Sequence, residues 1–296
     1  MSVYKTKQRE SQISHACLDL LAYYAVWGLR VDFNTIFSLV SIRTSHLAIK
    51  KQLVNLEKRG KVSLVDGKYG LSAHKYPNQK KMLGQQQILL KKALRWARAI
   101  GMLPFVKSIV VVNSVALGNA HDQSDIDLLI VTSPNRIFVS KGILMGVLKL
   151  LHQLEDQFVS AGRFSLGMFL TTKGVKMQKD IMKVNEPGLV YAMICAKPIY
   201  GASIWYGILK CDPYIQEKLP NFVWPKLPMR IYSSGFRIID RLDDIGYHRH
   251  LRHTAAQPKS HHPDAFIRVR PDIINLHHKG TSAQLATQWR SIRDNI

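Results

Sequence analysis

Two aspartates, Asp125 and Asp127, are the residues of this chain whose types and spacing most directly indicate chemistry. They stand just before an apolar run, Leu128 to Val131, that is typical of a buried strand. Residues two apart in a strand share a face, so both carboxylates are expected to point the same way. Paired carboxylates of this kind can hold Mg²⁺, which prefers a few carboxylates together with phosphate oxygens of a substrate.

A hydroxyl group precedes the aspartates at a point where the chain changes structure. The apolar run 108–112 predicts a buried strand, and it is followed by Asn113 and Ser114. A short helix is expected to begin at Ser114. The Ser114 hydroxyl and the amides at the start of that helix would suit a triphosphate. The sequence therefore places a phosphate-binding segment and a carboxylate pair at the ends of two consecutive strands.

This arrangement resembles the nucleotidyltransferase superfamily, which has the DNA polymerase β-like fold. The pattern there is Gly-Ser, a spacer, and then Asp-hydrophobic-Asp. Ser114 precedes Asp125 by eleven residues, and Gly118 and the string from Ser124 to Leu128 also match. The resemblance implies Mg²⁺ on the two catalytic aspartates, Asp125 and Asp127, and an NTP as substrate or ligand. The nucleotide contacts that it implies are Asn113, Ser114 and Ser124.

The chain departs from the family pattern at two places. Asn113 stands where the family has its glycine, so the approach of the backbone to the terminal phosphates is expected to differ. The family also has a third carboxylate on a later strand, and the matching segment here, residues 163–170, contains no acid. Ser165 or Gly167 occupies that position. Two acids, Glu155 and Asp156, are expected on the helix before this strand, and nothing in the sequence brings them to the metals.

Three helices and a hairpin are predicted before this domain. Helical spacing of apolar residues favours helices over about 12–29, 32–40 and 45–58. Asp66-Gly67 between two short strand-like runs, 62–65 and 68–71, is a strong hairpin signal. The order resembles a winged helix-turn-helix domain, in which the third helix enters the major groove and the wing touches the backbone. The nucleic-acid contacts that this implies are Arg43, His46, Lys50, Lys51, Lys61 and Lys68.

Charge favours a polyanionic partner. Lys and Arg number 42 against 20 Asp and Glu, which gives a net charge of +22, and 19 of the basic but only 5 of the acidic residues lie in the first 107 positions. This uneven distribution favours nucleic acid, DNA or RNA, as the partner of the N-terminal module. Docking of a protein is the alternative role of a winged helix.

Composition also restricts the class of protein. No stretch of eighteen apolar residues is present, so no membrane-spanning helix and no membrane partner are expected. The three cysteines are widely separated, which favours a reducing cytosol and a cytoplasmic protein over a disulfide scaffold. Seven of the twelve histidines lie within 248–278, at spacings that fit a basic surface better than a zinc site.

The sequence therefore predicts an α+β protein: an N-terminal winged helix plus a polymerase β-like nucleotidyltransferase domain with C-terminal helices. The expected divisions are a winged helix-turn-helix domain at 1–75, a linker and amphipathic helix at 76–104, a nucleotidyltransferase-like domain at 105–185, and a helical, basic extension at 186–296. The C-terminal helices are expected at 189–196, 203–209, 214–219 and 228–253.

Two functions follow from this architecture. The first is a Mg²⁺-dependent nucleotidyltransferase, which transfers a nucleoside monophosphate from an NTP to an unidentified acceptor hydroxyl on RNA, protein or a small molecule. The alternative is a nucleic-acid-binding regulator whose nucleotidyltransferase domain is degenerate and senses a nucleotide. The intact pair Asp125 and Asp127 favours the enzyme, and the missing third carboxylate favours the regulator.

Overall fold

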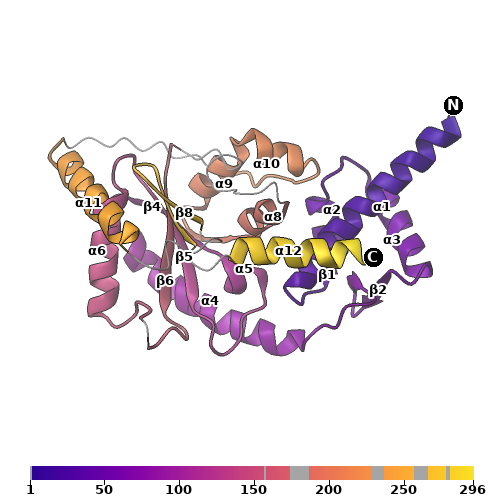
Figure 1. Ribbon diagram of the computed structural model, residues 1–296, viewed down its shortest axis with the longest axis horizontal. Coiled ribbons are helices and arrows are strands. Elements are labelled where there is room, and N and C mark those ends of the chain that lie inside the picture. The colour runs from indigo at the N-terminus through magenta and orange to yellow at the C-terminus, as the bar shows by residue number, and fades with distance from the viewer. Residues whose placement is uncertain (1, 157, 174–186, 228–236, 257–265, 278–280) are drawn as a thin grey trace. The chain divides into compact units, whose positions relative to one another are not determined.

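The computed structural model describes residues 2–156, 158–173, 187–227, 237–256, 266–277 and 281–296 (Figure 1). Contacts between these residues divide the chain into two compact units. Unit 1 consists of Met1–Gln79, Pro213–Trp224 and Gln284–Ile296, and unit 2 consists of Lys80–Asp212 and Pro225–Ala283. Each unit therefore contains segments that are far apart in the sequence.

Unit 1 contains three helices and a small sheet in its N-terminal segment. The helices are α1 (Ser2–Val26), α2 (Phe33–Leu39) and α3 (His46–Lys58), and the strands are β1 (Val31–Asp32), β2 (Val62–Val65) and β3 (Lys68–Leu71). The antiparallel order is β1-β3-β2. Asp32 and Ser45 cap α2 and α3 by accepting hydrogen bonds from backbone amides in the first turn. The hairpin turn has positive φ at both Asp66 and Gly67, as a tight two-residue turn requires.

Two late segments of the chain complete unit 1. The first contains α10 (Pro213–Lys218) and the second is most of α12 (Thr281–Asp294). The Asn221 side chain donates a hydrogen bond to the Ile42 carbonyl (2.8 Å) and accepts one from the Thr44 amide (3.2 Å). The Trp289 indole donates a hydrogen bond to the Asp19 carbonyl (2.9 Å). Side chains from the last third of the sequence thus bind loops and helices of the first fifty residues.

Unit 2 is built on a six-stranded sheet in the order β7-β4-β5-β6-β9-β8. Strands β5 and β6 are parallel, and every other neighbouring pair is antiparallel. Its strands are β4 (Val106–Val111), β5 (Ile126–Thr132), β6 (Phe164–Thr171), β7 (Lys197–Tyr200), β8 (Phe266–Arg270) and β9 (Ile273–His277). Its helices are α4 (Gln79–Gly101), α5 (Asn113–Leu117), α6 (Ile137–Leu150), α8 (Pro187–Cys195), α9 (Ala202–Lys210) and α11 (Arg237–Ala255).

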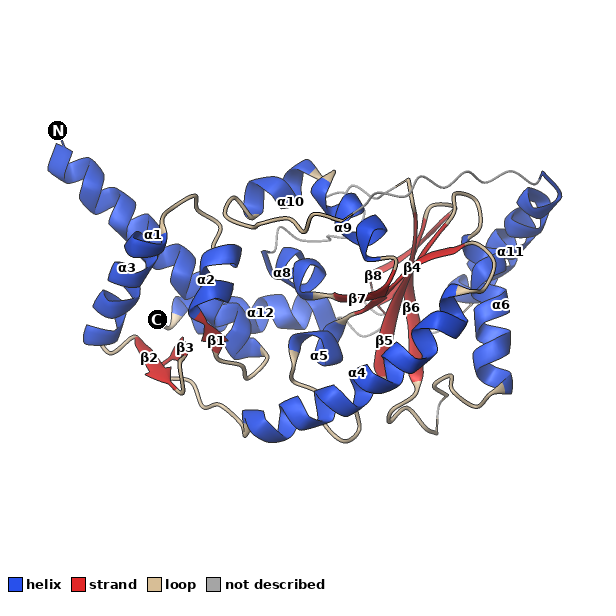
Figure 2. Ribbon diagram, turned by 180° about the vertical axis from the view of Figure 1, so that it is seen from behind, coloured by secondary structure: helices blue, strands red, loops and turns tan. Residues whose placement is uncertain are grey.

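The main core lies between α4, α6 and one face of this sheet. Figure 2 shows α4 crossing the strands on the viewer's side. From α4, Leu89 and Ala93 are buried in one apolar cluster with strand residues such as Ile109, Ile126 and Phe164. Because alternate residues of a strand point to opposite faces, burial of Ile126 here leaves its neighbours on the other face.

Helix α11 packs on α6 through buried charged groups. Arg136, almost fully buried before α6, forms an ion pair with Asp240 of α11. The Val139 amide donates a hydrogen bond to Asp243 (2.9 Å), and Lys141 Nζ lies 3.4 Å from His250 Nε2. Burial lowers the pKa of Lys141 to about 8, and burial together with the nearby cations lowers the pKa of His250 to about 4.

Mixed helices and strands confirm the α+β class, and the strands expected around the aspartates are present. Strand β7 and the β8–β9 hairpin were not predicted, since residues 186–296 were expected to be helical. Helix α11 begins at Arg237, and the earlier part of the helix expected from residue 228 lies outside the described residues. Among the helices that the structure describes, none is long and apolar enough to cross a membrane.

Candidate functional site

The two aspartates stand at the start of β5. Asp127 lies within the strand and Asp125 immediately precedes it. Both side chains are partly exposed, whereas Ile126 between them is fully buried in the core. This alternation is that of a strand with both aspartates on the face opposite the α4–α6 core.

Asn113 joins the end of β4 to α5 and contacts Asp127. Its φ is 55°, in the left-handed region that glycine adopts freely and that asparagine adopts more readily than other residues with a Cβ. Its Nδ2 donates a hydrogen bond to Asp127 Oδ2 at 2.9 Å. Asparagine thus satisfies the backbone requirement met in the family by glycine, and its amide restricts rotation of the Asp127 carboxylate. Ser114 follows in the first turn of α5, partly exposed.

Ser124 is buried and is part of the turn that leads into Asp125. Its hydroxyl accepts a hydrogen bond from the His121 amide, and its own amide donates to the His121 carbonyl, both at 2.9 Å. Its carbonyl accepts a hydrogen bond from the Gly162 amide (2.8 Å). These contacts hold the backbone before Asp125, so the structure places Ser124 as a support of the aspartate.

Of the two residues expected at the third-carboxylate position, Ser165 lies beside Asp127. Ser165 pairs in register with Asp127 across the parallel β5–β6 ladder, while Gly167 falls where this register shifts. The Ser165 hydroxyl donates a hydrogen bond to Glu155 Oε1 at 2.5 Å and lies within hydrogen-bonding reach of the Asp127 carboxylate. A hydroxyl has one proton, so it links the two carboxylates without donating to both at once.

Glu155 is therefore at the site, and the expected location of Glu155 and Asp156 on the preceding helix was wrong. Helix α6 ends at Leu150, because the chain then turns and runs beside β6. The Phe164 amide donates to the Gln153 carbonyl (2.8 Å), and the Glu155 amide donates to the Phe164 carbonyl (2.9 Å). This short parallel bridge brings the Glu155 side chain next to Ser165.

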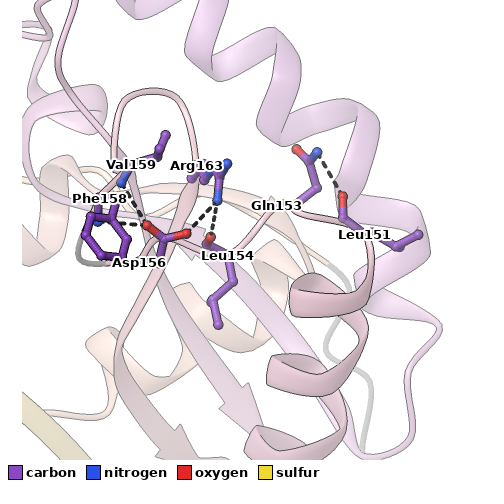
Figure 3. A network of polar contacts seen from close by, with 7 residues as sticks. All are labelled: Leu151, Gln153, Leu154, Asp156, Phe158, Val159 and Arg163. Carbon is purple, nitrogen blue, oxygen red and sulfur yellow. Dashed lines mark hydrogen bonds and ion pairs between the residues drawn. The ribbon is translucent and has the colours of Figure 1, made fainter.

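Asp156 has a different role in the adjoining turn (Figure 3). Its Oδ1 accepts hydrogen bonds from the amides of Phe158 and Val159, both at 2.8 Å, and its Oδ2 accepts one from Arg163 at 3.0 Å. The two backbone bonds, together with Arg163, hold the pKa of Asp156 below its ordinary value. Asp156 closes the turn, which fixes the position of Glu155.

The carboxylates of Asp127 and Glu155 repel each other. Burial raises the pKa of Asp127, and the negative charge of Glu155 raises it further. The hydrogen bond from Asn113 acts in the opposite direction by stabilising the ionised Asp127 carboxylate, and the Ser165 hydroxyl does the same when its proton points to Asp127 instead of Glu155. Two carboxylates held close together in this way attract a cation.

The donor set fits a metal that arrives with a nucleotide. Within the described ranges, no group of three His, Cys, Asp or Glu side chains is arranged to hold a metal ion by itself. The donors present are Asp125 and Asp127, with Glu155 linked through Ser165. Mg²⁺ is commonly held by one or two carboxylates and completed by phosphate oxygens, so two aspartates at one strand end fit a metal that arrives with a triphosphate.

The residues expected to contact nucleic acid all lie in unit 1, and several already have protein partners. Lys51 forms an ion pair with Glu10 (2.7 Å), and the His46 ring packs on the Phe37 ring with centroids 3.7 Å apart. Lys61 Nζ donates a hydrogen bond to the Ile296 carbonyl (2.7 Å). Of the other three, Arg43 and Lys50 are exposed and Lys68 is partly exposed.

Among the described histidines of the stretch 248–278, none belongs to a group of side chains that could hold a metal ion. His250 packs between α11 and α6, against the Phe138 ring and Lys141. His261, His262 and His278 lie outside the described residues.

Comparison with protein families supports the assignment of this part of the chain. Residues 90–181, about a third of the sequence, match the model of the nucleotidyltransferase domain. The matched segment contains β4, β5 and β6 and every residue of the site described above. This supports the nucleotidyltransferase superfamily and a general nucleotidyl transfer activity. No curated protein and no solved structure matched the chain.

Proposed function

We propose that this protein is a Mg²⁺-dependent nucleotidyltransferase, which transfers a nucleoside monophosphate from an NTP to an acceptor hydroxyl. The observation that carries the proposal is the contact of Asp127 and Glu155 with Ser165, at the strand end that also carries Asp125, within the segment that matches the nucleotidyltransferase domain. Asp125 and Asp127 would hold Mg²⁺, which when bound would neutralise charge on the triphosphate.

Each residue of the group has a role that follows from its contacts. Asn113 holds one oxygen of Asp127 and so keeps this carboxylate in one orientation. The partly exposed Ser114 hydroxyl is the proposed contact to the triphosphate. In the transfer, the acceptor oxygen bonds to the α-phosphorus, pyrophosphate leaves, and the hydroxyl proton passes to a base. Glu155 is the proposed base, because it is the carboxylate next to Asp127 that the bound metal does not require.

A second function is favoured by one specific observation. Ser165, which pairs in register with Asp127, is the residue that we assign to the position of the superfamily's third acid, and the described residues hold no group of three such side chains that could bind a metal ion. Under this alternative, the protein is a nucleic-acid-binding regulator that binds Mg²⁺ and NTP without turning the nucleotide over. The predicted winged helix at the N-terminus, with DNA or RNA as partner in the cytoplasm, is compatible with both functions.

Nucleotide binding tests the site that both functions share. Replacing Asp125 and Asp127 together with Asn removes the anionic ligands and keeps the side-chain volumes. Titration calorimetry with NTP and Mg²⁺ should show an affinity at least about tenfold lower, a difference of about 1.4 kcal/mol. Asp122→Asn is the matched control, because Asp122 is an exposed acid in the same loop that pairs with Lys81.

The control separates a specific site from general charge. The Asp122→Asn variant should bind Mg²⁺ and NTP as the unmodified protein does. Unchanged affinity in the double variant would refute the site assignment, and an equal loss in Asp122→Asn would attribute the effect to net charge. Once binding is established, incubation with labelled NTP and total cellular RNA or protein distinguishes the enzyme from the regulator.

A further inference from the structure

The outer face of α4 carries a row of cations that the candidate site does not use. Lys91, Arg95 and Arg98 are exposed and follow one another at intervals of four and three residues, with Gly84 and Gln87 on the same side. These five residues are called the α4 basic face below. The opposite side of the helix is apolar and buried against the sheet of unit 2, whereas the residues of the basic face are exposed.

No acidic side chain balances this row along the sequence. Between Asp66 and Asp122 the chain has nine Lys and Arg residues and no Asp or Glu. Within the part of the chain that the structure describes, Lys91, Arg95 and Arg98 form no ion pair. The neighbouring Lys92 shows the contrast, since its Nζ turns inward to the Gly162 carbonyl at 2.6 Å.

Such a row is unfavourable for the helix itself. Exposed helix faces are usually stabilised by opposite charges three or four residues apart, and like charges at these spacings are destabilising by about 0.2–0.5 kcal/mol per pair. Lys91–Arg95 and Arg95–Arg98 are both like-charge pairs at these spacings. A binding partner of opposite charge would remove this repulsion.

The spacing of the row suits a phosphate backbone. A helix rises 1.5 Å per residue, so Lys91 to Arg98 spans roughly 10 Å. One strand of a duplex presents a phosphate about every 3.4 Å along its axis, so roughly three phosphates occupy the same length. Three cations therefore face about three anions, a match that a single small anion would not use.

Side chains of α4 also connect this helix to the candidate site. Gln86 Nε2 donates a hydrogen bond to the Val115 carbonyl in α5 (2.7 Å), next to Ser114. Near the start of the helix, Lys81 pairs with Asp122 (3.1 Å), in the loop that leads to Asp125. We propose that the α4 basic face binds the phosphate backbone of nucleic acid. This surface belongs to unit 2 and is separate from the predicted winged-helix contacts, and the proposal concerns binding whether or not transfer occurs.

Salt-dependent binding of the full chain tests the proposal. The probes are a labelled duplex DNA and a labelled single-stranded RNA, each about 20 nucleotides long, and the variant is Lys91→Gln/Arg95→Gln/Arg98→Gln. Each lost phosphate contact lowers the slope of log K against log salt by about 0.9 for duplex DNA and about 0.7 for a single strand. We expect the slope to fall by about 2 to 3 and the affinity to fall at least tenfold for one or both probes.

A matched variant removes the same charge elsewhere. Lys149→Gln/Arg249→Gln/Arg252→Gln takes three exposed cations from α6 and α11. An equal loss of affinity in this control would overturn the proposal, because net charge alone would then account for binding. An unchanged slope in the α4 variant would also overturn it, most directly if Lys50→Glu in the predicted winged helix abolished binding by itself.

A second pair of variants adds charge without removing any contact. Gly84 on α4 and Gly146 on α6 are both exposed, and a Cβ added at either position meets no atom within 4 Å. Both Gly84→Glu and Gly146→Glu should therefore fold. We expect Gly84→Glu to weaken binding at least threefold and Gly146→Glu to leave it unchanged, and equal behaviour of the two would contradict the proposal.

Discussion

Asn113 offers a direct test of how the backbone prepares the candidate site. At φ 55° a residue with a Cβ is disfavoured by about 1–2 kcal/mol, whereas glycine adopts this conformation without strain. Asn113→Ala keeps the Cβ and removes the amide, and Asn113→Gly removes both. We therefore expect the free energy of unfolding of the Ala variant to be lower than that of the Gly variant by about 1 kcal/mol.

Both variants also lose the hydrogen bond to Asp127 Oδ2, which is 2.9 Å long. Hydrogen bonds to charged groups contribute about 1.5–3 kcal/mol, and partial exposure of both residues favours the lower end. The expected losses of stability are therefore about 1.5 kcal/mol for Asn113→Gly and about 2.5 kcal/mol for Asn113→Ala. At roughly 2–4 °C per kcal/mol, the Ala variant should melt about 5–10 °C lower than the unmodified protein.

Denaturant unfolding at neutral pH measures both differences, with equal m-values expected throughout. Asn135 is the matched control, because its φ of 54° is nearly the same and it lies away from the aspartates. Asn135→Ala and Asn135→Gly should differ by the same 1 kcal/mol or so, without the loss that comes from Asp127. If Asn113→Ala were as stable as Asn113→Gly, the left-handed backbone conformation would not disfavour a residue with a Cβ at this position. If both were as stable as the unmodified protein, the bond to Asp127 would be energetically irrelevant.

Two further predictions concern Glu155 and the α6–α11 interface. Ser165→Asp places a second carboxylate beside Glu155, so the melting temperature of this variant should be lower than that of the unmodified protein. Glu155→Gln alone should reduce nucleotidyl transfer at least tenfold, and of these three variants only Ser165→Asp/Glu155→Gln should retain transfer. A Glu155→Gln enzyme with an unchanged rate would exclude Glu155 as the base. The pKa of His250 is lowered to about 4 by burial and by Lys141 and His253, so the unfolded chain binds more protons between pH 6.5 and 4 and stability falls as the pH falls through this window. Each pKa unit corresponds to about 1.4 kcal/mol, and exposure to solvent reduces this value, so His250→Gln should remove about 1–2 kcal/mol of the stability that the protein loses in acid. Melting curves recorded at pH 7 and pH 4.5 measure this difference. An equal response of the unmodified protein and the His250→Gln variant to the change of pH would contradict the assignment.

The strands and their aspartates were predictable because their signal is local. A fully buried strand is a short apolar run, and the segments of β4 and β5 are such runs on either side of the spacer. The presence of Asp125 and Asp127 at one strand end follows from the sequence alone. The position of Ser165 opposite Asp127 follows only from the β5–β6 register, which sets two segments almost forty residues apart side by side.

The location of Glu155 could not be predicted, because it depends on where α6 ends. The apolar spacing of the helix gives no clear stop near Leu150, and no glycine or proline marks it. The helix ends in a local turn, in which His152 has a φ of 53° and the Gln153 amide donates a hydrogen bond to the Leu148 carbonyl (2.8 Å), and the chain then pairs with Phe164. A pairing partner of this kind leaves no signature in a single sequence.

Completion of unit 1 by the last residues of the chain has a consequence for its synthesis. A ribosome releases the N-terminal helices long before Asn221 and Trp289 have been polymerised, and the last of the partners emerges only with α12. The nascent helices therefore remain without these contacts while unit 2 is translated, and the slow closure of contacts more than 170 residues apart follows at the end. Premature termination near the C-terminus would consequently damage the first module to be made, and a fragment ending near residue 80 would lack part of its own fold.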